Sequence, residues 1–346
     1  MRIGISGMES FHELADDLAD YERAGVGVVN VAELYGFDAV SRLGYLAART
    51  STAALTSSIL PIYSRTPALT AMTAAGLDFV SRGRFELGIG TSGPQVIEGF
   101  HGTPFDVPVG RTREVIEICR AVWRREPLAY DGASYHYPLP AGQGSGLGKA
   151  LKLIDHPVRA DIPISVAAIG PRNVALAAEL AQAWEPAFFV PERAASVWSA
   201  PLAEGLARRD PALGPLGLTV GCPLAIGDDV EHLRDRGRPQ LALYIGGMGA
   251  RTANFYNNLA RRYGYEQEAE LLQDLYLSGR KKEAEAAVPA ELLARTSLIG
   301  PEGWVRERLA ILKEAGVTTL RVDPLAADKR GRLALIERLR QLTDDL

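Results

Sequence analysis

The stretch RFELGIGTSGPQVIEGFHG (residues 84–102) contains the spacing G-x-G-x-x-G between Gly88 and Gly93, directly after a strand-like run. This spacing is typical of dinucleotide-binding folds when it follows the first strand, opens directly into a helix and precedes an acidic residue by about 20 positions. Here the glycines run into Pro94, and the residue about 20 positions on lies within a predicted helix at 111–125. The strand before the glycines is moreover the fourth of the chain. The sequence therefore argues against a dinucleotide-binding fold.

Strand and helix patterns alternate along most of the chain. The predicted strands are 3–6, 28–32, 54–60, 84–90, 163–169, 187–190, 218–226 and 318–322, and helical periodicity follows each of them. Such an alternation is typical of two architectures, an open doubly wound sheet and a closed (β/α)8 barrel. Eight strand–helix pairs in 346 residues favour the barrel, which needs about 250 residues before insertions. We therefore predict an α/β protein with a (β/α)8 TIM-barrel fold.

Two segments interrupt this alternation. Between the fourth and fifth strands, a predicted hairpin at 130–137 is followed by a proline- and glycine-rich segment at 138–148. A long helical region at 230–287 follows the seventh strand. We predict that a single domain over residues 1–346 contains an insertion between strands 4 and 5 and extra helices after strand 7.

The composition is that of an ordinary soluble globular protein, with 47% hydrophobic residues, 23% charged residues and a net charge of −4. This small and dispersed charge argues against a nucleic-acid partner. An acidic residue, Glu9, precedes any apolar run typical of a signal peptide, and no stretch approaches the roughly 18 apolar residues of a membrane helix. We therefore expect a cytoplasmic protein without a membrane partner.

No pattern of metal ligands stands out. Cys119 and Cys222 lie in a predicted helix and a predicted strand, far apart in the sequence, and we expect both to be buried thiols. The histidines are isolated from one another: His12, His101, His136, His156 and His232. We therefore predict no metal site.

In a (β/α)8 barrel the active site is built from loops at the carboxyl ends of the strands, and two of these loops suit an anion. The loop after the fourth strand, Gly90-Thr91-Ser92-Gly93, offers unhindered backbone N–H groups and two hydroxyls. The loop after the fifth strand, Ala168-Ile169-Gly170-Pro171-Arg172-Asn173, opens a helix whose free N–H groups and arginine can converge on a phosphate. Each loop alone could equally be a tight turn with a helix cap. Together they favour a ligand that carries a phosphate.

Four side chains near strand ends are candidates for proton transfer. Glu9 and Glu33 would project into the barrel mouth, where burial suits a carboxyl group to this task. Either could instead cap the following helix or form a salt bridge with a neighbouring loop. Tyr63 and His101, which follow the third and fourth strands, are weaker candidates.

Several longer stretches resemble one family. They are NVAELYGFDAVSRLGYLAART at 30–50, SSILPIYSRTPALTAMTAAGLDFVSRGRFELGIGTSGPQVIEGFHG at 57–102, GRTREVIEICRAVWR at 110–124, LGKALKL at 147–153, VAAIGPRN at 166–173 and YIGGMGARTANFYNNLARRYG at 244–264. Together they make the chain similar to the luciferase-like barrel superfamily, in the branch that uses coenzyme F420 and is related to methylenetetrahydromethanopterin reductase. The resemblance extends over nearly the whole length.

The resemblance implies a small-molecule substrate and coenzyme F420, an 8-hydroxy-5-deazaflavin that carries a hydride at C5 and lies across the barrel mouth. It implies that the Ser58–Ile59 peptide bond is cis and forms a bulge behind the ring. It further implies that the two glycine-containing loops hold the coenzyme's side chain and phosphate, that Glu9 lies near the ring, and that the protein is a homodimer.

The chain also departs from its relatives. Several have a histidine after the acidic residue that ends strand two, where this chain has Leu34, and a glutamate after the glycine loop of strand four, where it has Pro94. Because sugar-phosphate and alcohol dehydrogenases use that pair, we expect instead the reduction of an activated C=N or C=C bond, which needs only one proton donor. We expect residues 246–249 to contact the substrate. Two alternatives stay open, an FMN-dependent luciferase-like monooxygenase and a cofactor-less barrel that acts as a binding or structural subunit.

Overall fold

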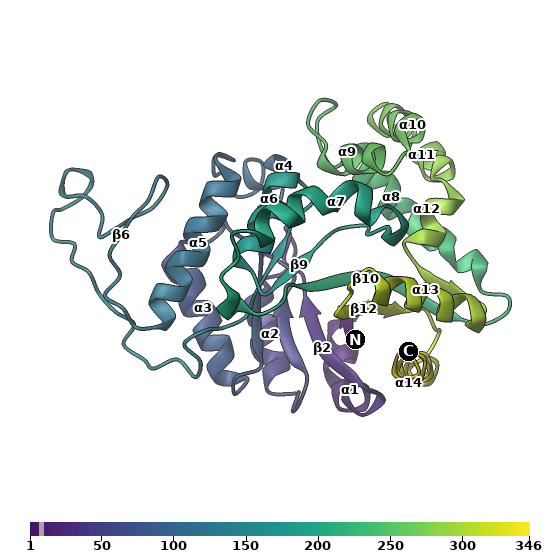
Figure 1. Cartoon of the computed structure of the whole chain (residues 1–346), viewed down its shortest axis with the longest axis horizontal. Coiled ribbons are helices and arrows are strands. Elements are labelled where there is room, and N and C mark those ends of the chain that lie inside the picture. Colours follow the sequence, from purple (N-terminus) through teal and green to yellow (C-terminus); the bar gives the residue numbers. More distant parts are fainter. Residues whose placement is uncertain (7–9) are drawn as a thin grey trace.

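The computed structural model of the chain describes residues 1–6 and 10–346. Eight parallel strands pair side by side, and the ring closes where the last strand pairs with the first (Figure 1). In ring order the strands are β1 (Arg2–Ser6), β2 (Val26–Val31), β3 (Ala54–Ser57), β5 (Phe85–Gly90), β8 (Ile164–Ala167), β9 (Ala183–Glu185), β10 (Gly217–Ile226) and β12 (Thr319–Pro324). The predicted (β/α)8 barrel is therefore confirmed.

Helices surround this ring of strands. Those that complete the eight strand–helix units are α1 (Phe11–Ala24), α2 (Ala39–Ala47), α3 (Pro67–Val80), α5 (Pro108–Trp123), α6 (Pro171–Leu180), α7 (Pro191–Leu206), α13 (Glu302–Glu314) and α14 (Lys329–Asp344). The two ends of the chain lie near each other in Figure 1, because β1 and β12 are neighbours and α14 packs beside α1.

The first helix shows how local sequence sets these elements. The hydroxyl of Ser10 accepts a hydrogen bond from the Glu13 backbone N–H (3.3 Å) and so caps the N-terminus of α1. Leu14 and Leu18, four residues apart, are fully buried against the barrel. The helix ends at Gly25, whose φ of 111° favours glycine.

The sixth barrel strand was predicted wrongly at 187–190. The strand is β9, which pairs with β8 through Ser165 and Ala183, and Pro186 follows its last residue. The side chain of Trp184 is buried inside, and its indole N–H donates to the Ala168 carbonyl (2.9 Å). The apolar residues at 187–190 belong instead to the loop after the strand, where they cover the barrel mouth rather than its wall.

Both predicted additions to the barrel are present. Between β5 and β8, a hairpin of β6 (Tyr130–Asp131) and β7 (His136–Tyr137) leads into a long irregular segment that projects beyond α5 at the left of Figure 1. The extra elements after β10 lie at the upper right: η3 (Glu231–Gly237), α8 (Arg238–Ala242), η4 (Leu243–Gly247), α9 (Phe255–Arg262), α10 (Glu266–Leu277), α11 (Lys281–Ala287) and α12 (Ala290–Arg295). A short strand that the sequence did not predict, β11 (Leu298–Gly300), pairs with β10 outside the ring.

Within residues 1–6 and 10–346, no helix is long and apolar enough to cross a membrane. The same residues hold no group of three or more His, Cys, Asp or Glu side chains placed to bind a metal ion. The Cys119 thiol is buried in α5, and Cys222 is half-buried in β10; both are free cysteines.

Candidate active site

A bulge separates β3 from β4 (Leu60–Pro61) on the wall of the barrel mouth. Thr56 pairs with Glu86 and Leu60 pairs with Ile89, so four steps along one strand face three along β5. The extra residue lies where the Ser58–Ile59 peptide bond is cis, as the family resemblance implies. The short strands β3 and β4 thus form one interrupted barrel strand, with the bulge between them.

Gly88 of β5 makes this bulge possible. The Ser57 hydroxyl accepts a hydrogen bond from the Gly88 N–H (2.9 Å) and donates one to the Gly88 carbonyl (2.9 Å), which replaces the missing ladder bonds. A Cβ on Gly88 would lie 2.9 Å from the Ser57 carbonyl carbon and would overlap its oxygen. The first glycine of the G-x-G-x-x-G spacing therefore serves the bulge and not a dinucleotide.

The loop after β5 lies against the same bulge. A Cβ on Gly90 would lie 3.1 Å from Ile59 Cγ1, so the glycine lets the bulge and the loop touch closely. Ser92 has a φ of 57°, an uncommon conformation for a residue other than glycine. Gly93 then precedes the short helix α4 (Pro94–Ile97). The loop therefore has a defined turn conformation that packs against the bulge.

The second predicted anion loop begins α6. Gly170 occupies the N-cap without a side-chain cap, and a Cβ placed on it would meet no atom within 4 Å. Asn173 lies in the first turn, and its enclosed Oδ1 has no hydrogen-bond partner in the described part of the chain. An uncapped helix start with open space in front of it suits an anionic group.

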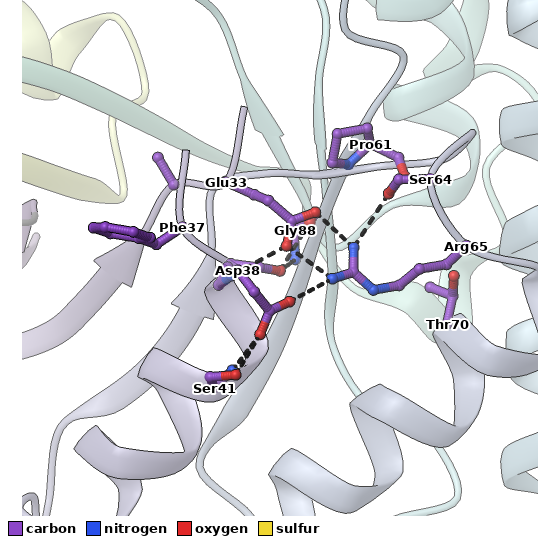
Figure 2. Close-up of polar contacts among 12 residues, drawn as sticks. Glu33, Phe37, Asp38, Ser41, Pro61, Ser64, Arg65, Thr70 and Gly88 are labelled. Atoms are coloured by element: carbon purple, nitrogen blue, oxygen red, sulfur yellow. Dashed lines mark hydrogen bonds and ion pairs between the residues drawn. The ribbon is translucent and has the colours of Figure 1, made fainter. Parts of the chain in front are cut away.

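Glu33 follows β2 and is almost fully buried. Figure 2 shows its two carboxylate oxygens facing the guanidinium of Arg65, with N–O distances of 2.6 Å and 2.8 Å. Its Oε2 also accepts from the Ala39 N–H at the start of α2 (3.1 Å), and Asp38 binds the same arginine (2.9 Å). The hydrogen bond to Glu33 raises the pKa of Arg65. The structure thus shows the helix cap and salt bridge that were the alternative to proton transfer.

The other predicted proton-transfer residues differ in their surroundings. Tyr63 is buried, which raises its pKa to about 12, and its hydroxyl donates to the Asp106 carbonyl (2.6 Å). His101 lies in the loop after α4, and its Nε2 is enclosed without a hydrogen-bond partner among the described residues. Glu9 lies outside the described residues.

A cavity of about 440 Å³ opens at the carboxyl ends of the strands. Its walls come from β1, β8, β9, β10 and β12 and from the extra elements after β10; they include Ser6, Ala167, Glu185, Cys222, Arg321, Asp323, Leu241 and Tyr244. The insertion after the seventh strand therefore closes one side of the barrel mouth.

Comparison with known proteins places this architecture in a family. The sequence profile described as luciferase-like monooxygenase matches residues 2–319. The chain belongs to the luciferase-like monooxygenase family. The recognition made from the sequence alone is thereby confirmed.

Three similar proteins illustrate where this luciferase-like chain stands. A Mycobacterium tuberculosis protein, named provisionally as a coenzyme F420-dependent oxidoreductase, is 40% identical over 97% of both chains. The 5,10-methylenetetrahydromethanopterin reductase of Archaeoglobus fulgidus is 26% identical over 89% of this chain and 92% of its own length. The solved structure of the coenzyme F420-dependent tetrahydromethanopterin reductase of Methanopyrus kandleri has a TM-score of 0.78, with 21% identity and 97% coverage of both chains.

Sequence reasoning missed an ion pair inside this luciferase-like barrel. Glu185, the last residue of β9, pairs with Arg321 of β12, and both line the cavity. The Ser58 hydroxyl at the bulge donates to Glu185 Oε1 (2.5 Å) and accepts from Arg321. The signal for Arg321 was an arginine between the apolar residues Leu320 and Val322 of the strand TLRVDP. The wrong position of the sixth strand concealed Glu185.

An aromatic wall was also missed. Phe188, which has a φ of 47°, packs edge-on against Tyr244, and Tyr244 packs against Tyr256 at 4.7 Å between ring centroids. Tyr244 stands on η4, a single turn of π-helix, a form that often occurs at functional sites. The expectation that 246–249 contacts the substrate stays a prediction; at Gly247, a Cβ would lie 2.6 Å from Cδ1 of Tyr276 on α10. The paired glycines let α10 approach η4.

Proposed function

We propose that the chain is an oxidoreductase that binds coenzyme F420 across the barrel mouth and uses it to reduce an activated C=N or C=C bond of a small molecule. The observation that supports this most is the bulge between β3 and β4, against which Gly88 and Gly90 pack closely, in a chain with a relative that is named for this coenzyme. When bound, the coenzyme supplies a hydride from C5.

The residues present fit such a ligand. The bulge offers a backbone surface for one face of a planar ring, and the side chain of Ile59 lies beside Gly90. The open space at Gly170 and the uncapped start of α6 suit the phosphate-bearing side chain. Arg172 follows in the same turn and adds positive charge. In this arrangement the protein positions the ring and excludes water from it.

Proton transfer in this proposal falls to Glu9 or His101. Both oxygens of Glu33 are engaged by Arg65, and the Tyr63 hydroxyl is engaged by a backbone carbonyl. We therefore assign Glu33 to holding the loop after β2 in place. The Nε2 of His101 has no hydrogen-bond partner within residues 1–6 and 10–346, which is why we keep His101 as a candidate for proton transfer.

Two other functions compete with this one. An FMN-dependent monooxygenase would use the same fold and agrees with the name of the family profile. A barrel that binds no cofactor would not require the close fit of Gly88 and Gly90 around the bulge. That fit favours a cofactor, and titration with F420 and FMN separates the first two functions.

Gly170→Trp tests the position of the side-chain site. The indole would fill the open space before α6, and we expect the affinity for F420, measured by fluorescence titration, to fall at least about 100-fold. Gly303→Trp is the matched control, because Gly303 also lies at a helix start and its Cβ would meet no atom within 4 Å. Wild-type affinity in Gly170→Trp would place the coenzyme elsewhere.

We also propose that the chain forms a homodimer through the insertion between β5 and β8. Leu147 and Ile154 in this segment are 85% and 89% exposed, and Leu139, Leu151 and Val158 are at least half exposed, so the segment presents a group of apolar side chains that favours burial against a partner. Sedimentation velocity is expected to give about twice the mass of 37.3 kDa, and the double variant Leu147→Asp, Ile154→Asp to sediment as a monomer. A monomeric wild-type protein at micromolar concentration would refute this proposal.

A further inference from the structure

The Glu185–Arg321 ion pair is largely buried, and burial of an ion pair carries a cost in stability. Arg321 is buried in the barrel wall, and Glu185 is almost fully buried at the end of β9. Removing two charges from water carries a large desolvation cost, and apolar side chains of the same size often stabilise a fold as well or better. A charged pair at the edge of a ligand-sized cavity therefore points to a function in binding.

The barrel is shaped to accommodate this pair. Gly4 of β1 leaves room for the arginine, because a Cβ there would lie 3.0 Å from Arg321 Cγ. Gly221 of β10 lies on the other side of the arginine, and a Cβ placed on it would lie 3.6 Å from Arg321 Nη2. Small residues on both neighbouring strands thus give the guanidinium its place next to the cavity.

The pair keeps hydrogen-bonding capacity that no residue in the described part of the chain uses. Glu185 Oε1 receives the Ser58 hydroxyl and faces Arg321, whereas no described residue donates a hydrogen bond to Oε2. Arg321 Nε is enclosed without a partner among the described residues, and each Nη nitrogen has two hydrogens of which the named contacts use one. An acceptor and a donor therefore lie side by side on the cavity wall.

We propose that Glu185 and Arg321 together bind the pyrimidinedione edge of the deazaflavin ring. The carboxylate accepts the ring N–H at position 3, and the guanidinium donates to a carbonyl next to it. This inference rests on the proposed function, because it takes F420 as the ligand. The same pair fixes the Ser58 hydroxyl, so the bulge behind the ring and the group that reads its edge are one hydrogen-bonded unit.

The hydrogen-bond pattern favours the pyrimidinedione edge over the opposite edge of the ring. The ionised 8-hydroxy end presents one acceptor oxygen and no N–H, so it could accept from Arg321 but would leave the carboxylate of Glu185 without a donor and be repelled by it. The pyrimidinedione edge alternates carbonyl, N–H and carbonyl. Only this edge matches both side chains. The Glu185 carboxylate accepts a hydrogen bond and needs an N–H, whereas the neighbouring Arg321 guanidinium donates and needs a carbonyl.

The test compares F420 with its N3-methyl derivative, which lacks the ring N–H. Fluorescence titration of the wild-type protein is expected to give at least about 30-fold weaker binding of the methylated coenzyme. Glu185→Gln and Arg321→Lys are expected to bind unmodified F420 about tenfold more weakly and to discriminate less between the two forms. The ligand comparison on wild-type protein needs no variant to fold.

Asp78→Asn and Arg159→Lys are the matched control variants. Asp78 is a buried carboxylate paired with Arg159 at the amino-terminal end of β5, on the opposite side of the barrel from the cavity. They are expected to lower the unfolding temperature without changing F420 affinity. Equal wild-type affinity for both forms of the coenzyme would overturn this inference alone. Failure of wild-type protein to bind either form would overturn the proposed function and the inference with it.

Discussion

Gly88→Ala is expected to lower the free energy of unfolding by at least about 3 kcal/mol and to abolish F420 binding. The new methyl group would overlap the Ser57 carbonyl oxygen and would lie 3.1 Å from Ser165 Oγ. Relief requires the backbone of the bulge to move, which would also break the two hydrogen bonds between Ser57 and Gly88. Urea denaturation and fluorescence titration of the same preparation measure both effects.

Gly76→Ala is the matched control for this substitution. Gly76 lies in α3, where a Cβ would meet no atom within 4 Å, so alanine is expected to stabilise the protein by about 0.5–1 kcal/mol through its higher helix propensity. A Gly88→Ala protein with unchanged stability and affinity would show that the bulge is not fixed by this contact.

Arg65→Met is expected to destabilise the protein by about 3–5 kcal/mol. The side chain of Arg65 is 13% exposed and that of Glu33 is 8% exposed, so the substitution leaves a buried carboxylate without its counter-ion. The loop after β2 and the start of α2 would lose their common anchor, as Figure 2 shows for Asp38 and Ser41. Arg124→Met, which removes an exposed pair with Glu126, is expected to change stability by less than about 0.5 kcal/mol.

Substitutions of Glu33 and Arg65 distinguish a structural role of Glu33 from a role in proton transfer. If the carboxylate only holds the loop, Glu33→Gln and Arg65→Met lower stability and coenzyme affinity together, and the pH profile of the remaining activity keeps its shape. If Glu33 transfers the proton, Glu33→Gln loses kcat and alters the pH profile while Arg65→Met retains both. Our assignment predicts the first pattern.

The fold could be predicted from the sequence because strand and helix patterns alternate along most of the chain, with stop signals such as Gly25 after α1. β9 was misplaced for a physical reason. Only three residues pair there, and Glu185 is charged, so the longer apolar run after Pro186 gave the stronger strand pattern. Phe188 of that run packs against Tyr244 and Tyr256 of the extra elements, and a local sequence pattern does not reveal such a tertiary contact.

The candidate site was predicted in part. Gly88 marks its position in the sequence because a Cβ there would overlap the backbone of Ser57, and Gly90 marks its position because a Cβ there would crowd the side chain of Ile59. The alternatives for Glu33 stayed open, since its partner Arg65 lies on a different loop and only the fold brings them together. Arg321 was missed for the same reason, because its partner comes from β9.

The most direct test of the central claim is titration of the purified protein with coenzyme F420 and, separately, with FMN, followed by measurement of oxygen consumption with each reduced cofactor. We expect tight binding of F420, little affinity for FMN and no oxygen consumption. Stoichiometric binding of FMN without affinity for the deazaflavin, together with oxygen uptake, would contradict it.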